Sequence, residues 1–224
     1  RMDLVIFDLD GTLVDSKLDL AHSVNAARGH MGLPPLEHEL VSSYVGNGAP
    51  VLIRRVLGAE ASEADVQHAL EFFLAYYHEH MLDCTRLYPG VQASLDRLRQ
   101  ARVAMAVLTN KPVKISQAIL DGLGVGGHFF RVYGGNSFEQ KKPHPMGVDR
   151  LIEEASAGRE RTLLVGDSAV DIRTARNANV RSAGVTYGFQ PESLADEPPD
   201  FLADRMEQVA DFVLAGCNDQ GESS

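Results

Sequence analysis

The sequence predicts an α/β fold, in which a parallel sheet flanked by helices carries an inserted segment that is entirely helical. From residue 91 onward, short apolar runs of strand length alternate with amphipathic stretches of helical length, as in βαβ units. Residues 16–82, by contrast, contain helical patterns only, and they follow a lone strand-like run, DLVIF, at residues 3–7. We therefore expect a discontinuous α/β core, formed by residues 1–15 and 83–224, and a helical cap formed by residues 16–82.

The individual elements follow from local patterns and from residues that break the chain. Gly32, Pro34 and Pro35 end the first helix, whereas Ser62 with Asp65 has the form of a capping box and begins the last cap helix. The expected strands lie at residues 3–7, 103–108, 129–133, 162–165 and 182–186. The expected helices lie at residues 15–31, 36–44, 49–57, 62–80, 91–101, 113–120, 146–155, 169–178 and 206–214, and the polar residues 216–224 are expected to fray.

Composition and charge exclude several classes of protein. The chain has 21 basic and 31 acidic residues, a formal net charge of −10, and 44% hydrophobic residues. This charge argues against nucleic-acid binding and against an anionic membrane surface, because both need a positive field. It leaves room for a small anionic metabolite in a local pocket. No run of about 18 apolar residues occurs, so we expect no membrane span, while a monomer and a homodimer both remain open.

Cysteine use and the start of the chain bear on location. The 2 cysteines, Cys84 and Cys217, lie far apart and in no CxxC pattern. That spacing favours a reducing compartment without a disulfide framework, and we therefore expect a cytoplasmic protein. Residues 1–3 run directly into the first strand-like segment, so we expect no signal peptide.

Two aspartates follow the first strand, in the segment Asp8-Leu9-Asp10-Gly11-Thr12. Because side chains alternate along a strand, Asp8 and Asp10 point the same way, and two adjacent carboxylates at the end of an apolar strand need a cation or a proton between them. Open α/β sheets also place their sites at the carboxyl ends of parallel strands. The alternative is a plain turn at Asp10 and Gly11 with Asp8 as a cap, but an apolar run tolerates such a turn more easily with one acid than with two.

Two further segments offer groups that could bind a phosphate. Thr109 and Asn110 follow a buried strand and precede a helix, where a hydroxyl and free backbone amides suit a phosphate oxygen, although a helix cap is the commoner role of such a pair. Pro143 and Pro145 constrain the backbone that presents Lys142. A lysine on a constrained loop can supply a point charge to a phosphoryl group, and in isolation a solvated surface lysine is the commoner interpretation.

A fourth segment, Gly166-Asp167-Ser168, ends another apolar strand, and Asp171 lies four residues after Asp167. If a helix begins at Ser168, Asp171 lies in its first turn and can reach back toward Asp167. Hard cations such as Mg²⁺ prefer a few carboxylate oxygens together with water and phosphate. The pair is therefore a candidate magnesium site, with an acidic helix cap as the alternative.

Together, the four segments resemble the motifs of the haloacid dehalogenase superfamily, in the same order and over essentially the whole chain. The DxDGT form of the first segment resembles the phosphotransferase branch rather than the dehalogenases, which lack the second aspartate. The resemblance implies a Rossmann-like parallel sheet core with an inserted small all-helical cap domain. Within the superfamily, residues 42–49, Arg55 and residues 186–188 resemble the bacterial phosphoglycolate phosphatases.

This resemblance implies a magnesium-dependent phosphomonoester hydrolase that forms a phospho-aspartyl intermediate. Asp8 would attack the phosphorus, and Asp10 would protonate the leaving alkoxide and later activate water. The groups implied to bind Mg²⁺ are Asp8, the backbone carbonyl of Asp10, Asp167 and Asp171. Those implied to hold the phosphoryl oxygens are Thr109, the Asn110 amide and Lys142.

The cap is implied to recognise the rest of the substrate. If that substrate is 2-phosphoglycolate, its carboxylate needs a cation, and Arg55 is the candidate because a guanidinium can bind a carboxylate with two hydrogen bonds. A surface arginine is the open alternative for Arg55. Asn47 and Gly48 would lie in a cap loop that reaches the site when the two domains close.

Other functions fit the same motifs. Within the fold, the substrate could instead be a sugar phosphate, a nucleotide or pyrophosphate, or the protein could be a hexose-phosphate mutase. Outside the enzymes, a regulator of this fold could bind phosphate without turnover, but such a binder does not need Asp10 beside Asp8.

Overall fold

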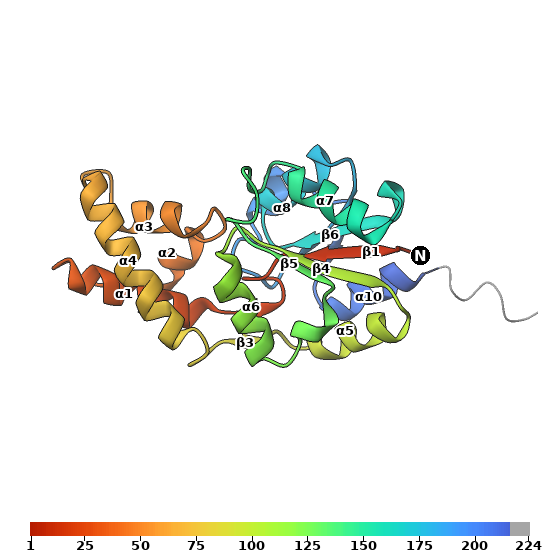
Figure 1. The fold of residues 1–224 in the computed structure, drawn as a ribbon, viewed down its shortest axis with the longest axis horizontal. Coiled ribbons are helices and arrows are strands. Elements are labelled where there is room, and N and C mark those ends of the chain that lie inside the picture. The colour runs from red at the N-terminus through yellow and green to blue at the C-terminus, as the bar shows by residue number, and fades with distance from the viewer. Residues whose placement is uncertain (216–224) are drawn as a thin grey trace, which may run out of the picture.

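The computed structural model describes residues 1–215; residues 216–224, with Cys217 and the segment expected to fray, lie outside the described residues. A six-stranded sheet with the strand order β5-β4-β1-β6-β7-β8 forms the centre of the described chain (Figure 1). All neighbouring strands run parallel, so their carboxyl ends meet at one edge. In sheet order, the strands are Arg131–Tyr133, Ala104–Leu108, Leu4–Phe7, Thr162–Gly166, Arg181–Val185 and Phe201–Ala203.

Helices cover both faces of the sheet because strand side chains alternate between the two faces. On β1, Val5 and Phe7 belong to a core cluster with residues of α5, α6 and α10, whereas Leu4 and Ile6 belong to a second cluster with residues of α7 and α8. Figure 1 shows these two groups of helices on opposite sides of the sheet. All four side chains are fully buried, which explains the continuous apolar run of this strand. The flanking helices are α5 (Val91–Gln100), α6 (Val113–Gly122), α7 (Met146–Ala155), α8 (Ala169–Asn177) and α10 (Met206–Leu214).

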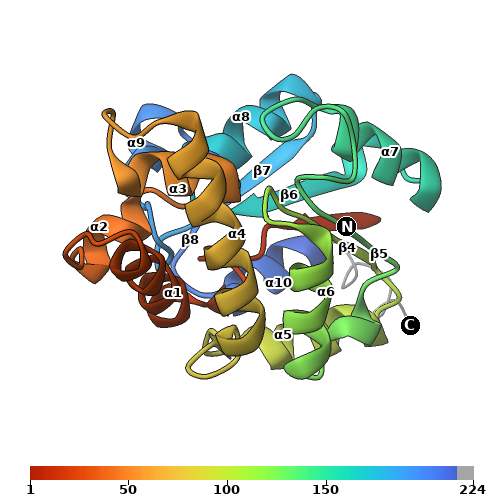
Figure 2. The ribbon, with the colours of Figure 1, turned by 60° about the vertical axis from the view of Figure 1, so that its left-hand side comes forward.

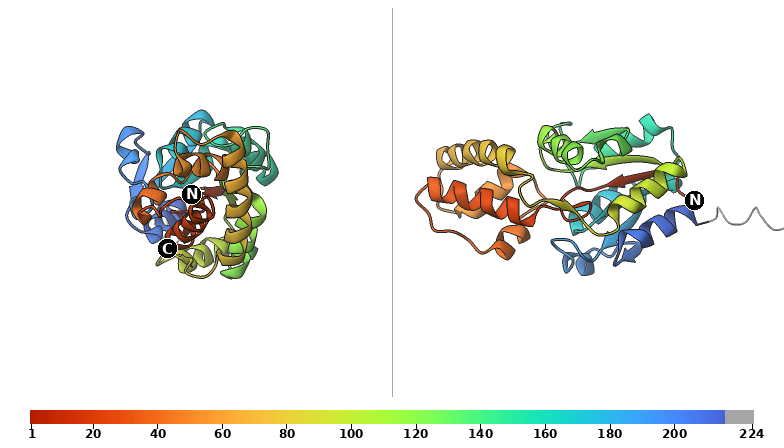
Figure 3. Two further views of the ribbon diagram at one scale, coloured as in Figure 1. Left: turned by 90° about the vertical axis from the view of Figure 1, so that its left-hand side faces the viewer. Right: turned by 90° about the horizontal axis from the view of Figure 1, so that it is seen from below.

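A helical bundle lies beyond the carboxyl ends of the strands, and Figures 2 and 3 show it in front of and beside the sheet. It consists of α1 (Lys17–His30), α2 (His38–Ser43), α3 (Ala49–Leu57) and α4 (Glu63–His80). The expected capping box begins α4, because the amide of Asp65 donates to Ser62 Oγ at 3.1 Å. The α/β fold class with an inserted all-helical cap is thus confirmed. None of the described helices is both long and apolar enough to cross a membrane.

Several short elements were not expected from the sequence. The edge strand β8 (Phe201–Ala203) has no buried apolar run, since Leu202 is 55% exposed, and the short helix α9 (Ser193–Asp196) precedes it. A separate antiparallel pair joins β2 (Val14–Asp15) to β3 (Arg86–Leu87). These two strands are the two connections between the core and the cap, and each is too short to show a periodic pattern.

Candidate active site

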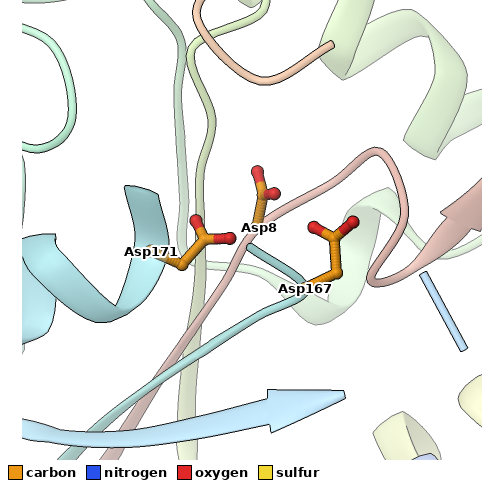
Figure 4. Close-up of side chains that lie close together, drawn as sticks. All are labelled: Asp8, Asp167 and Asp171. Atoms are coloured by element: carbon orange, nitrogen blue, oxygen red, sulfur yellow. The ribbon is translucent and has the colours of Figure 1, made fainter. Parts of the chain in front are cut away.

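Three carboxylates converge at the carboxyl edge of the sheet (Figure 4). β1 and β6 are parallel neighbours with Phe7 opposite Val165, so Asp8 lies opposite Gly166, and Asp167 follows directly at the same edge of the sheet. Asp171 approaches from the first turn of α8. One carboxylate oxygen from each aspartate lies within 4.8 Å of the others, so the structure brings the predicted pair to Asp8.

Lys142 lies directly against this cluster. Its Nζ is 3.1 Å from Oδ1 of Asp8 and 2.7 Å from Oδ1 of Asp171, and its side chain is 2% exposed. Burial lowers the pKa of Lys142, but the charges of Asp171 and Asp8 outweigh burial and hold the pKa above its usual value. The lysine is therefore a buried cation at the site rather than a solvated surface residue.

The cluster carries more negative charge than Lys142 alone can balance. Burial, and next the charge of Asp171, raise the pKa of Asp8 to about 7 against the opposing effect of Lys142. Burial, Asp8 and Asp171 likewise raise the pKa of Asp167 well above its usual range. Carboxylate oxygens from three residues are the donors that a hard divalent cation prefers, and such a cation relieves their repulsion. The residues present therefore fit a divalent metal ion.

Gly11 allows the chain to turn closely beside this cluster. Its φ is +81°, and a Cβ at this position would lie 2.2 Å from Oδ2 of Asp167, so a larger residue would displace that carboxylate. The backbone amide of Phe189 donates to the same oxygen at 2.8 Å. Asp167 is thus fixed by the turn on one side and by a backbone hydrogen bond on the other.

A second group of polar side chains holds Asp10. The Ser16 hydroxyl donates to Oδ1 of Asp10, and Nζ of Lys111 lies 3.2 and 3.1 Å from the two carboxylate oxygens. Lys111 Nζ also donates to the hydroxyl of Tyr77, which belongs to cap helix α4. Neither Lys111 nor Tyr77 is among the predicted site residues; the position of Lys111 directly after Thr109 and Asn110 is the sequence signal that points to it.

Thr109 and Asn110 make polar contacts where β4 ends. Thr109 Oγ1 accepts a hydrogen bond from the Lys111 amide at 3.1 Å, which is a local turn-capping contact. Asn110 Nδ2 donates to the carbonyl oxygens of Gly46 and Lys142, both at 3.0 Å, and Asn110 Oδ1 accepts from the Lys142 amide at 3.0 Å. Asn110 therefore connects the core, the lysine loop and the cap.

The cap loop at residues 43–48 is closed over the site. Core side chains hold its backbone: Nε2 of Gln190 donates to the carbonyl of Val45, and Nζ of Lys141 donates to the carbonyl of Asn47. A Cβ on Gly48 would lie 3.2 Å from the carbonyl oxygen of Asn110, so this glycine, at a φ of +93°, permits the loop to approach the core closely. Gly48 lines the site, whereas Asn47 contributes a backbone oxygen and is not among the lining residues.

Arg55 lies outside the site cavity in this structure. It is exposed on α3, and its Nη1 donates to the carbonyl of Tyr44 at 3.0 Å. Burial and, after it, the charge of Arg55 lower the pKa of Lys141, so the two cations are neighbours at the cap loop. The role of Arg55 toward a substrate carboxylate stays a prediction.

A cavity between the cap and the core joins these groups. Charged lining side chains come from Asp8, Asp10, Lys111 and Asp167, and Thr109 and Asn110 lie beside them. The rest of the wall is largely apolar, with Leu52, Phe73 and Leu74 from the cap and Ile115 and Phe189 from the core. The arrangement suits a small ligand with an anionic group at the floor.

The chain belongs to the haloacid dehalogenase-like hydrolases, whose family pattern it matches over residues 5–185. It is similar to curated phosphoglycolate phosphatases, at 40% identity over 221 residues to the protein from Vibrio vulnificus, covering 96% of this chain and 97% of the relative. The protein of that name from Pseudomonas putida is 40% identical over 223 residues, covering 96% of this chain and 80% of the relative.

Solved structures show the same relationship. A predicted phosphoglycolate phosphatase from Haemophilus somnus superposes with a TM-score of 0.88 at 36% identity, covering 95% of this chain and 96% of the other. These findings confirm the predicted superfamily, the resemblance to phosphoglycolate phosphatases and the class of enzyme, a phosphatase.

Proposed function

We propose that this phosphatase hydrolyses 2-phosphoglycolate to glycolate and phosphate, with Mg²⁺, through a phospho-aspartyl intermediate on Asp8. The observation that carries the proposal is the position of Asp8 at the floor of the cavity, 3.1 Å from Lys142, with Asp10 also lining that cavity. We choose 2-phosphoglycolate as the substrate because the similar curated proteins are phosphoglycolate phosphatases. The cysteine pattern supports a cytoplasmic setting for this reaction.

Asp8 is the nucleophile of the proposed reaction. Its carboxylate oxygen attacks the phosphorus, the bond to the leaving alkoxide breaks, and Lys142 keeps positive charge beside the reacting groups. Thr109, the amide of Asn110 and Lys142 hold the equatorial phosphoryl oxygens. Water then attacks the phospho-aspartate, releases phosphate and restores Asp8.

Asp10 is the general acid and base. It gives its proton to the leaving glycolate oxygen in the first step and takes a proton from the attacking water in the second. Ser16 and Lys111 fix the orientation of its carboxylate, so that it need not be ordered anew at each turnover.

Asp8, Asp167, Asp171 and the backbone carbonyl of Asp10 would hold the magnesium ion. When bound, the ion supplies positive charge that offsets the repulsion between an anionic nucleophile and an anionic phosphate. The crowding of carboxylates and the raised pKa values of Asp8 and Asp167 support this assignment, because a cation among these groups relieves their repulsion and favours their ionised forms.

Phosphate release from a panel of esters tests the proposal. The panel contains 2-phosphoglycolate, hexose phosphates, nucleotides and pyrophosphate, with Mg²⁺, and compares the chain with Asp8→Asn. We expect a strong preference for 2-phosphoglycolate and no turnover in the variant. Broad, weak activity that the variant loses would retain the mechanism and reject the named substrate. Equal activity in the variant would reject Asp8 as the nucleophile.

A further inference from the structure

The cavity contains a cation for which the proposed chemistry has assigned no role toward substrate. Among the lining residues that the structure describes, Lys111 is the only lysine or arginine. The Lys111 side chain is 6% exposed, so its ammonium group is almost completely removed from bulk solvent. A buried lysine that faces a ligand cavity is a strong site for an anionic group of that ligand.

The position of Lys111 relative to Asp10 determines which part of a ligand it can meet. Asp10 must contact the ester oxygen of the leaving group, and Nζ of Lys111 lies 3.1 Å from the Asp10 carboxylate. A substituent one carbon away from that ester oxygen therefore lies next to Lys111. In 2-phosphoglycolate, the substituent at that place is the carboxylate.

Tyr77 offers a second hydrogen-bond donor at the same point. Its hydroxyl accepts a hydrogen bond from Lys111, which leaves the phenolic proton available to a ligand oxygen in the cavity that Tyr77 lines. Burial, together with the charges of Asp10 and Asp19, raises the pKa of Tyr77 well above its usual value, so the phenol stays protonated. Lys111 and Tyr77 thus present an ammonium group and a hydroxyl side by side.

Within the described part of the chain, the rest of the cavity wall holds no second lysine or arginine. The cap side chains Leu52, Phe73 and Leu74 are apolar, and Gln190 uses its amide nitrogen on the carbonyls of Ser43 and Val45. An ester with a long or strongly polar leaving group would have to bury polar atoms against these side chains without partners. The geometry therefore favours a leaving group that is short and carries one anion near the ester oxygen.

We infer that Lys111, assisted by the hydroxyl of Tyr77, binds the carboxylate of the leaving group and so selects short 2-phosphorylated acids, in place of Arg55. The inference rests on the proposed function, since it needs hydrolysis at Asp8 with Asp10 against the leaving oxygen. Because Tyr77 belongs to the cap and Lys111 to the core, the carboxylate also connects the two domains. Substrates without that anion lose this connection.

The test compares kcat/KM for two esters that differ in the carboxylate alone: 2-phosphoglycolate and 2-hydroxyethyl phosphate. Lys111→Met removes the charge, Tyr77→Phe removes the hydroxyl while keeping the ring, Arg55→Met removes the rival cation, and Lys114→Met is the matched control on the exposed face of α6. Melting temperatures of all variants confirm that each is folded. Inhibition by glycolate of 2-hydroxyethyl phosphate hydrolysis gives a second readout that does not depend on turnover of the acid.

We expect Lys111→Met to lower kcat/KM for 2-phosphoglycolate at least roughly 30-fold more than for 2-hydroxyethyl phosphate, and to weaken glycolate inhibition by a similar factor. Tyr77→Phe should lower the preference about fivefold, and Arg55→Met and Lys114→Met should leave it unchanged. An equal fall for both esters in Lys111→Met would overturn the inference, since Lys111 would then act only through Asp10. Loss of the preference in Arg55→Met instead would also overturn it. A wild-type enzyme that hydrolyses phosphate esters without preferring the acid would overturn both the proposed substrate and the inference.

Discussion

The side chain of Asn110 forms two hydrogen bonds with the backbone of Lys142: Nδ2 donates to the carbonyl and Oδ1 accepts from the amide, both at 3.0 Å. A third bond, from Nδ2 to the carbonyl of Gly46, reaches the cap loop. Asn110 therefore places the lysine that contacts Asp8 and, with the same amide group, binds the closed cap. The phosphate site and cap closure share one side chain.

Asn110→Ala should therefore weaken catalysis through the position of Lys142. Losing these hydrogen bonds should raise the activation free energy by about 2 kcal/mol, which lowers kcat/KM roughly 30-fold. Most of the loss should appear in kcat. Steady-state kinetics of wild type and Asn110→Ala on the preferred ester measure kcat and kcat/KM. Asn177→Ala is the control, because Asn177 Nδ2 also donates to this loop, at the carbonyl of Pro143, but from an exposed position. If both variants lose activity equally, the two-bond contact has no special role.

The stability of the metal-free protein should depend on pH through Asp8. Its pKa is raised to about 7 in the folded state from 3.8, so the folded protein holds a proton that the unfolded chain has released. That proton stabilises the fold below about pH 4, and the contribution is lost as the pH rises toward 7; a shift of this size corresponds to ~4 kcal/mol.

Urea unfolding of wild type and of Asp8→Asn, both in chelator from pH 4 to pH 8, measures this difference. We expect the wild-type free energy of unfolding to fall more steeply with pH than that of Asp8→Asn, and the variant to be the more stable of the two at pH 8. Parallel pH profiles for the two proteins would contradict the raised pKa.

Binding of a divalent cation should remove this repulsion and stabilise the fold. Mg²⁺ should raise the melting temperature of the metal-free protein at pH 8, since it binds the folded state in preference to the unfolded one. Asp167→Asn should raise the half-saturating Mg²⁺ concentration by at least about tenfold, because a carboxylate ligand is lost. The exposed Asp149, paired with Arg159 at 2.7 Å, provides the control Asp149→Asn. An unchanged Mg²⁺ response in Asp167→Asn would place the ion elsewhere.

The role of Asp10 should appear as a dependence on the leaving group. Asp10→Asn should lower kcat for an alkyl ester such as 2-phosphoglycolate on the order of 10²–10⁴-fold, because the alkoxide leaves without a proton. The burst of p-nitrophenolate from p-nitrophenyl phosphate should be affected far less, because that leaving group needs no proton. Rapid-mixing experiments measure the rate of leaving-group release from both esters in wild type and Asp10→Asn. Equal decreases of this rate for the two esters would argue against Asp10 as a general acid.

The convergence of the candidate site residues at one edge was predictable because parallel strands end there. Asp8, Thr109 and Asp167 follow apolar strands, and parallel strands end at one edge, so the local pattern of each segment suffices to bring them together. The role of Arg55 was not predictable in this way, because the sequence left a substrate-binding arginine and a surface arginine both open.

Contacts between distant segments were not predictable from local pattern. Lys111 follows a strand within a turn, and nothing beside it in the sequence reveals that its side chain meets Asp10 and Tyr77. Likewise, β2 and β3 pair residues that are more than 70 positions apart, and their two-residue length gives no periodic signal. Such features depend on how the cap is placed against the core.

Asp19 makes another contact that local pattern did not predict, and this contact should contribute strongly to the stability of the fold. It lies in the first turn of α1 and is 1% exposed, and its carboxylate accepts from the amide of Cys84 at 2.9 Å, the amide of Thr85 at 2.8 Å and the Thr85 hydroxyl at 2.7 Å. It therefore joins the segment that enters the cap to the segment that leaves it. Asp19→Asn keeps the size of the side chain but turns an amide nitrogen toward these donors.

We expect Asp19→Asn to lower the free energy of unfolding by about 2 kcal/mol, since buried donors lose their acceptor. Melting curves in Mg²⁺ should then show a decrease of roughly 4–8 °C for a chain of this length. Asp83→Ala is the matched control, because Asp83 lies next to the same segment but is exposed and pairs with His80 at 2.7 Å, an interaction that contributes about 0–1 kcal/mol. Equal melting temperatures for Asp19→Asn and wild type would mean that the two cap connections are held by β2 and β3 rather than by this carboxylate.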